Sequence, residues 1–259
     1  FVLMILNWSV EAYKWRYIIK KIEDVKFLKA ILSVFTGVSI SLFTPYRTGE
    51  YIGRVLMLNH RNRIESGILT FIGSISQQAI TLLVGFIAMM FYVDFNLFLT
   101  ILFFLLIIFV FVIYYKLHFC ISFISRWFKS EKINNYVNIF NTYNNAELSK
   151  ILFISFVRYL IFSLQYYLIL WKYDIRLATD SLYVIPLIFL FTSVIPSFVI
   201  LDIGIRGSVS IYFIEAIYGN QTGIAVNAFS SSLVLWLINI IIPAIIGTIG
   251  VFMIKLTTK

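Results

Sequence analysis

The sequence predicts an all-α protein, a polytopic bundle of transmembrane helices with two broken or re-entrant helical elements. Of the 259 residues, 61% are hydrophobic and 13% are charged, whereas a soluble domain carries about a quarter charged residues. Residues 67–93, 95–115 and 181–201 contain no charged side chain. Each of these blocks is at least as long as the roughly 20 residues that a helix needs to cross about 30 Å of hydrocarbon. Two further apolar runs are interrupted by proline, glycine and charged pairs, which predicts the broken elements.

We expect residues 1–259 to form a single integral membrane domain. The chain opens with FVLMILNW, already inside an apolar run, with neither an initiator methionine nor the charged region of a signal peptide. This opening predicts that the sequence starts partway through a longer protein, with one or more preceding spans missing.

The first elements lie at a predicted membrane interface. Residues 1–6 read as the end of a span, and residues 7–29 mix six basic and three acidic residues with tryptophan and tyrosine. Aromatic belts and clusters of Lys and Arg are typical of the cytoplasmic interface. Trp8, Glu11 and Trp15 share one helical face, which suggests a helix that leaves the bilayer and then lies along its surface.

The next apolar run, residues 30–43, is short for a full crossing and is followed by FTPYRTGEYIGR. Pro45 lacks a backbone N–H and Gly49 relaxes the backbone, so the helix should break here. Residues 67–93 and 95–115 should then form a helical hairpin that turns at VDFN. After the long polar loop 116–150, residues 148–171 should cross outward, interrupted by the single charge of Arg158.

The final third repeats the early pattern. An apolar run from residue 181 reaches IPSFVILDIGIRGS, where Pro196 and Gly204 predict another break, and residues 225–254 form the last crossing. The distribution of Lys and Arg places the loops near Asn62 and Asn135 in the cytoplasm and those near Asn96 and Asn220 outside. This topology requires residues 181–218 to cross an even number of times or to form a re-entrant pair.

Charge and cysteine content narrow the possible functions. The net charge is +9, but the basic residues lie in short loops between apolar blocks, so they indicate orientation and contacts with anionic lipid rather than nucleic acid. The single Cys120 cannot form an internal disulfide, and no Cys/His cluster has metal-ligand spacing. We therefore expect neither a metal nor a cofactor.

The two breaks share a pattern of proline, glycine, an acid and an arginine. Arg47, Glu50 and Arg54 are spaced to meet on one helical face, and Asp202 and Arg206 are four residues apart. Transporters use such discontinuous helices to build substrate sites near the middle of the bilayer. The alternative is that both segments are ordinary loop ends whose arginines contact lipid phosphates.

Three segments resemble the transmembrane region shared by bacterial lysylphosphatidylglycerol synthase/flippase proteins and their stand-alone relatives. They are LNWSVEAYKW, TPYRTGEYIGR and IPSFVILDIGIRG. Pro45, Arg47, Gly49 and Glu50 match that family's P-x-R-x-G-E motif. Gly204 and Arg206 fit its second motif, but Gly207 stands where many members have glutamate, an acid that Asp202 could supply instead.

The resemblance implies a membrane domain that handles lipid. In two-domain members, a cytosolic domain attaches an amino acid to phosphatidylglycerol and the membrane domain moves the product across the bilayer. The present sequence contains no such soluble domain, so aminoacyl transfer by this chain is not expected. The resemblance also implies a multi-pass protein of the bacterial cytoplasmic (inner) membrane, with membrane phospholipids and a separate lipid-biosynthetic enzyme as partners.

Our leading hypothesis is a lipid flippase-like transporter whose broken elements face a polar cavity. Arg47, Arg54 and Arg206 are the candidates for binding a lipid phosphate, since guanidinium offers phosphate a planar fork. Glu50 and Asp202 would hold these arginines or contact a cationic headgroup. The remaining candidates are Arg158 and Glu11 in the cavity, and Pro45, Gly49, Pro196 and Gly204 at the helix breaks.

Two alternatives remain open from the sequence. In a membrane-embedded transferase acting on a lipid-linked sugar or amino acid, Glu50 or Asp202 would be the base. In a non-catalytic accessory subunit, the same charges would serve helix packing. The sequence contains no metal-ligand set and no nucleotide-phosphate loop, which favours transport over an enzyme.

Overall fold

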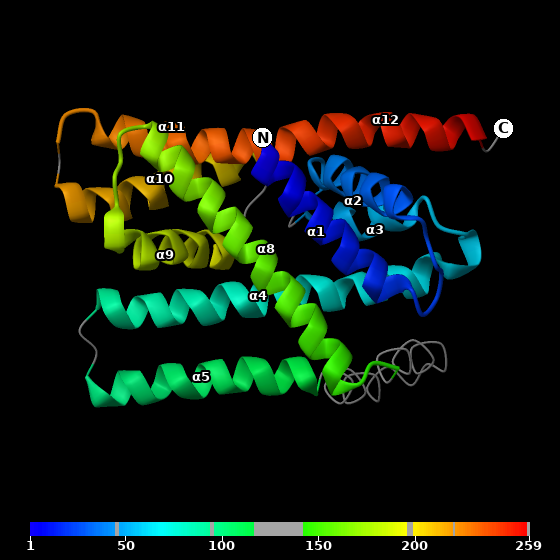
Figure 1. The fold of residues 1–259 in the computed structure, drawn as a ribbon, viewed down its shortest axis with the longest axis horizontal. Coiled ribbons are helices and arrows are strands. Elements are labelled where there is room, and N and C mark those ends of the chain that lie inside the picture. Colours follow the sequence, from blue (N-terminus) through cyan, green and yellow to red (C-terminus); the bar gives the residue numbers. More distant parts are fainter. Residues whose placement is uncertain (45–46, 94–95, 117–141, 196–198, 220, 258–259) are drawn as a thin grey trace.

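The computed structural model describes residues 1–44, 47–93, 96–116, 142–195, 199–219 and 221–257. Within these ranges every regular element is a helix, which confirms the predicted all-α class (Figure 1). Four helical segments are long and apolar enough to cross a membrane: His60–Tyr92, Leu97–Tyr115, Asn145–Lys172 and Ile224–Phe252. The polytopic membrane architecture is therefore confirmed for the described part of the chain.

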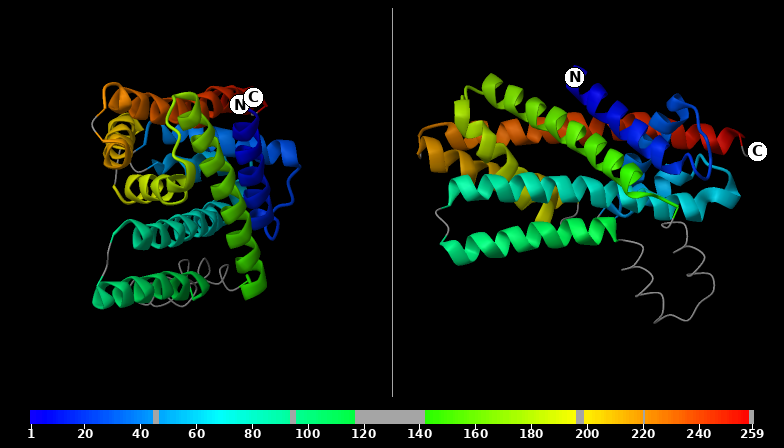
Figure 2. Two further views of the ribbon diagram at one scale, coloured as in Figure 1. Left: turned by 60° about the vertical axis from the view of Figure 1, so that its left-hand side comes forward. Right: turned by 60° about the horizontal axis from the view of Figure 1, so that its bottom comes forward.

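The predicted hairpin is formed by α4 (Arg63–Tyr92) and α5 (Leu97–Tyr115), which pack against each other. Both views in Figure 2 place α5 at the edge of the bundle. Along α5 the buried side chain is Tyr114, whereas its leucines, isoleucines and phenylalanines are largely exposed. Within the described part of the chain, α5 therefore presents an apolar surface that is suited to contact lipid.

Helix α1 (Val2–Ile19) buries among other helices the face that the sequence placed at the membrane surface. It is one continuous helix that packs against α2, α4 and α8. Trp8 is 5% exposed and Trp15 is fully buried, with its indole Nε1 donating to Thr70 Oγ1 at 3.0 Å. The face that mixes tryptophan with charge points into the bundle because its charges have partners there.

The first broken element consists of α2 (Phe27–Ser41) and the short α3 (Gly49–Val55), which pack together. A Cβ added to Gly53 would lie 2.6 Å from the Cα of Gly37, and one on Gly49 would lie 2.7 Å from the carbonyl oxygen of Ile40. The two backbones therefore touch through small residues, as in tightly packed membrane helices. Gly49 begins α3 directly after the break, and Pro45 lies outside the described residues.

The second broken element consists of α9 (Ser181–Val194) and α10 (Val199–Tyr218). Helix α9 packs against α4, and α10 packs against α11 (Ile224–Trp236). Pro196 lies outside the described residues. The expectation that Gly204 marks the break is wrong: Gly204 lies inside α10, because the backbone is already helical from Val199 onward.

The last helical segment continues from α11 through a π-helical turn (Leu237–Ile241) into α12 (Ile242–Thr257). Figure 1 shows these elements as one long rod along the edge of the molecule, with α2 beside α12. A Cβ on Gly247 would lie 2.0 Å from the carbonyl oxygen of Phe35. Glycine at this position therefore permits the close approach of α12 to α2.

We expect Gly247→Ala to destabilise the protein, because its methyl group would overlap the α2 backbone and force α12 away. Overpacking of this kind costs about 1–3 kcal/mol. The melting temperature of the detergent-purified protein, followed by tryptophan fluorescence, should fall. Gly67→Ala is the matched control, since the nearest atom to its new Cβ would be a Val55 methyl carbon at 3.9 Å. A drop in melting temperature for Gly67→Ala equal to that for Gly247→Ala would contradict the argument.

Candidate functional site

One buried carboxylate, that of Glu11 on α1, holds three basic side chains together. Its Oε2 lies 2.8 Å from Lys14 Nζ and 3.1 Å from Arg158 Nη1, and its Oε1 lies 2.8 Å from Arg54 Nη1. Glu11 is only 3% exposed. A buried charge is tolerated only when it is paired and hydrogen-bonded, and here the pairs link α1 to α3 and to α8 (Asn145–Lys172).

The same charge cluster reaches α4 and the first broken element. Arg54 also pairs with Glu50 four residues earlier, so its guanidinium is held between two carboxylates. Lys14 Nζ donates to the carbonyl oxygen of Gly73 at 3.2 Å. Arg158 Nη1 donates to Gln77 Oε1 at 3.4 Å, and its guanidinium lies 5.3 Å from the centre of the Trp8 ring.

Arg47 lies at the first break, between α2 and α3. It has a positive φ of 56°, in the left-handed region that non-glycine residues seldom adopt. Glu50 from the first broken element and Asp202 and Arg206 from the second lie within its electrostatic reach. Asp202 and Arg206 pair with each other at 2.8 Å along α10. Arg47 and Arg206 therefore border the same cavity, although they lie far apart in the sequence.

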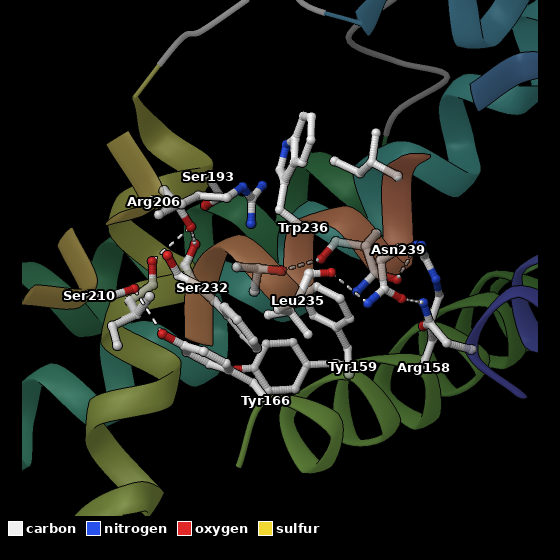
Figure 3. A pocket seen from close by; sticks show the side chains of 18 of the residues that line it. Arg158, Tyr159, Tyr166, Ser193, Arg206, Ser210, Ser232, Leu235, Trp236 and Asn239 are labelled. Atoms are coloured by element: carbon white, nitrogen blue, oxygen red, sulfur yellow. Dashed lines mark hydrogen bonds between the residues drawn. The ribbon is translucent and has the colours of Figure 1, made fainter. Parts of the chain in front are cut away.

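These arginines border a cavity of about 190 Å³ between α1, α4, α8, α9, α10 and α11. Arg47, Arg158 and Arg206 are the charged residues in its described lining. Figure 3 shows Arg206 and Arg158 on opposite sides of the cavity, with aromatic rings between them. The uncharged polar lining consists of Asn7, Gln77, Thr81, Tyr159, Tyr166, Thr192, Ser193, Ser210, Ser232 and Asn239.

An amide chain crosses the wall of the cavity. Asn239 Nδ2 donates to Gln165 Oε1 at 3.1 Å and to the Leu235 carbonyl oxygen at 3.0 Å. Asn7 Nδ2 donates to Asn239 Oδ1 at 3.4 Å. Asn239 sits in the π-helical turn, and such turns are frequent at functional sites. Neither asparagine stands out in the sequence, since no motif surrounds them and their contact depends on the tertiary fold.

Several polar atoms of the lining are buried without a hydrogen-bond partner in the described structure. They are the Nε of Arg47 and of Arg158, the indole Nε1 of Trp8 and of Trp236, the hydroxyl of Tyr159 and the Oδ1 of Asn7. Buried polar groups in native proteins are normally hydrogen-bonded, and an exception calls for an explanation. These unpartnered atoms belong to side chains of the lining, whose charged groups are the guanidinium donors of Arg47, Arg158 and Arg206.

The predicted site residues divide into two groups. Arg47, Arg158 and Arg206 line the cavity together. Arg54, only 4% exposed, is instead enclosed between Glu11 and Glu50, and Asp202 supports Arg206. Glu11, which the sequence suggested merely as a cavity residue, is the centre of the ion-pair cluster.

The second family-like motif lies on α10. Asp202 supplies the acid that pairs with Arg206. A Cβ on Gly207 would lie 2.2 Å from the Phe229 ring, so Gly207 faces α11. A glutamate at this position would collide with that ring. Among the described residues, no heavy atom lies within 4 Å of a Cβ added to Gly204, and Gly204 is not part of the described lining.

A comparison with protein families gives one match that covers almost the whole chain. The family described as the lysylphosphatidylglycerol synthase TM region matches residues 1–247. No curated protein and no solved structure matches the chain.

Proposed function

Because the chain belongs to the family of the lysylphosphatidylglycerol synthase transmembrane region, we propose that it moves an anionic or modified lipid across the membrane. Membership makes it a multi-pass membrane protein linked to lipid handling. The finer proposal is a flippase of the bacterial cytoplasmic membrane that receives its lipid from a separate biosynthetic enzyme.

The cavity with three arginines is the observation that carries this proposal. Guanidinium groups bind phosphate oxygens through two parallel hydrogen bonds, and such charge-assisted bonds are stronger than neutral ones. Arg47 and Arg206 come from different broken elements, while Arg158 comes from α8. A lipid phosphate bound between them would touch both broken elements, and its acyl chains could remain in the bilayer.

The arrangement of the carboxylates favours transport over the transferase alternative. Glu50 and Asp202, the candidate bases, are each paired with an arginine four residues further on. A carboxylate stabilised by an adjacent cation is a poor general base. In the transport hypothesis these carboxylates orient the arginines, which is what the contacts support.

Transport can be tested in vesicles that contain the purified protein and a phospholipid labelled on one acyl chain. An impermeant reductant destroys only the label in the outer leaflet, so movement of lipid between leaflets appears as extra loss of fluorescence. We expect faster loss with the protein than without it. Mass spectrometry of the recovered lipids should find no new product; a modified lipid would support the transferase alternative.

Arg158→Leu should slow this transport about tenfold or more, the effect of losing a hydrogen bond to a charged group. Glu11 would keep Lys14 and Arg54 as partners, so the protein should still fold. Arg176→Leu makes the same chemical change on an exposed loop and should transport normally. Wild-type transport by Arg158→Leu would exclude Arg158 from the headgroup site.

A further inference from the structure

The wall of the cavity is suited to one class of phospholipid headgroup. We propose that the cavity selects a phosphodiester headgroup whose other polar groups are uncharged hydroxyls, and discriminates against headgroups that carry an amino acid's ammonium groups. This inference rests on the proposed lipid transport and specifies its substrate. This substrate class differs from lysyl-phosphatidylglycerol because the lining of this chain's cavity is positively charged.

The charge of the cavity lining favours an anionic headgroup over one that carries ammonium groups. Within the described lining the charged residues are three arginines, and no carboxylate faces the cavity. The nearby carboxylates Glu11, Glu50 and Asp202 are already bound to basic groups. The cavity lining and the ion pairs beside it contain five basic side chains against these three carboxylates. The five are Lys14, Arg47, Arg54, Arg158 and Arg206. The excess of two positive charges would be reduced by a phosphodiester and increased by ammonium groups.

The aromatic side chains of the lining could in principle bind an ammonium group through their ring faces. Arg158 already lies over the Trp8 ring, 5.3 Å from its centre. The Phe189 ring packs against Phe162 at 5.0 Å and against Tyr166 at 5.8 Å between centres. Several of the lining rings therefore already have a guanidinium or another ring as a partner.

The unpartnered polar atoms of the lining residues include both a hydrogen-bond acceptor and hydrogen-bond donors. Asn7 Oδ1 accepts hydrogen bonds, whereas the indole Nε1 groups of Trp8 and Trp236 donate them. These three side chains are 1%, 5% and 7% exposed, so each atom is removed from bulk water. A hydroxyl group both donates and accepts, so it suits acceptors and donors alike, whereas an ammonium only donates and cannot bond to an indole N–H.

The size of the cavity agrees with a compact headgroup. Its volume of about 190 Å³ is below the roughly 300–1,000 Å³ of sites that enclose drug-sized ligands. A phosphate with a small polyol is compact, whereas a lysyl ester would add a long flexible side chain and two positive charges. The volume and the charge of the cavity therefore both favour a small phosphodiester headgroup with hydroxyl groups.

The test compares three lipids in vesicles that contain the protein: phosphatidylglycerol, lysyl-phosphatidylglycerol and a polyprenyl-phosphate hexose. We expect at least one of the two anionic hydroxylated lipids to move about tenfold faster than lysyl-phosphatidylglycerol, the ratio for a difference of 1.4 kcal/mol. The faster of the two identifies whether the phosphate belongs to a glycerolipid or to a glycosyl carrier. Equal or faster movement of lysyl-phosphatidylglycerol would overturn the inference and leave the proposed transport intact.

A binding measurement separates the inference from the transport proposal. Short-chain versions of the same lipids, titrated while tryptophan fluorescence is recorded, report occupancy near Trp8 and Trp236. If no lipid is transported but the hydroxylated lipids still bind about tenfold tighter, the transport proposal fails and the selectivity stands. Tighter binding of lysyl-phosphatidylglycerol would overturn the selectivity.

Two variants test whether Asn7 and Trp236 determine the headgroup preference. Asn7→Asp adds a carboxylate to the lining and should raise transport of lysyl-phosphatidylglycerol relative to phosphatidylglycerol about threefold to tenfold. Trp236→Phe keeps a ring but removes the N–H, and should weaken binding of the hydroxylated lipids by a similar factor. Asn227→Asp, on α11 outside the described lining, is the matched control. An unchanged preference in both cavity variants would overturn the assignment.

Discussion

Replacing Glu11 by leucine should leave little folded protein. The substitution would strand Lys14 and Arg158 without their carboxylate partner, at 1% and 20% side-chain exposure. Breaking a buried ion pair by removing one partner costs about 3–5 kcal/mol, because the remaining charge stays desolvated. That loss is a large part of the roughly 5–15 kcal/mol that stabilises a typical protein. Yield after size-exclusion chromatography in mild detergent, together with the melting temperature, would measure the effect.

A second substitution distinguishes loss of charge balance from loss of packing. Glu11→Leu combined with Lys14→Met should be more stable than Glu11→Leu alone, because it removes the most enclosed unpaired cation. Asp24→Leu removes an exposed carboxylate, 63% accessible in its pair with Arg16, and should hardly change stability. A Glu11→Leu protein as stable as the wild type would show that the fold does not depend on this cluster.

Much of the fold follows from local features of the sequence. The α4–α5 hairpin is evident because two uncharged blocks of membrane-spanning length are separated by a short polar turn. The broken element around Gly49 is evident because proline and glycine interrupt an apolar run. Gly204 was misplaced because glycine is also accepted inside a helix where nothing crowds it, so its presence alone does not locate a break.

The site could be predicted only in part. Arg158 stood out because a lone charge in an apolar span needs a partner. The role of Glu11 could not be read from its neighbours, because two of its three partners, Arg54 and Arg158, lie far along the chain. The mixture of tryptophan and charge around Glu11 is shared by surface helices and by buried polar faces, which explains why α1 was expected at the interface. Tertiary contacts decide between these cases.

Arg47→Lys should reduce lipid transport about tenfold or more, although it keeps the positive charge. Lysine offers a compact ammonium on a flexible stem and cannot reproduce the planar fork with which arginine binds two phosphate oxygens. A lysine at position 47 must adopt the same positive φ of 56° as the arginine does, so the backbone strain is nearly unchanged. Arg176→Lys, in an exposed loop, is the matched control. Rates are to be normalised to folded protein in the labelled-lipid vesicle assay.

A double-mutant cycle extends this test to the meeting of the two broken elements. If Arg47 and Arg206 bind one phosphate, removing either disrupts the same complex, so Arg47→Ala with Arg206→Ala should lose little more than either single change. Any backbone strain at position 47 is common to the single and the double variant and cancels in the cycle. Losses that multiply would mean that the two arginines act independently, as ordinary loop-end residues would. Coupled losses would mean that one headgroup contacts both broken elements, which is what a transporter needs if their relative movement is to carry the lipid.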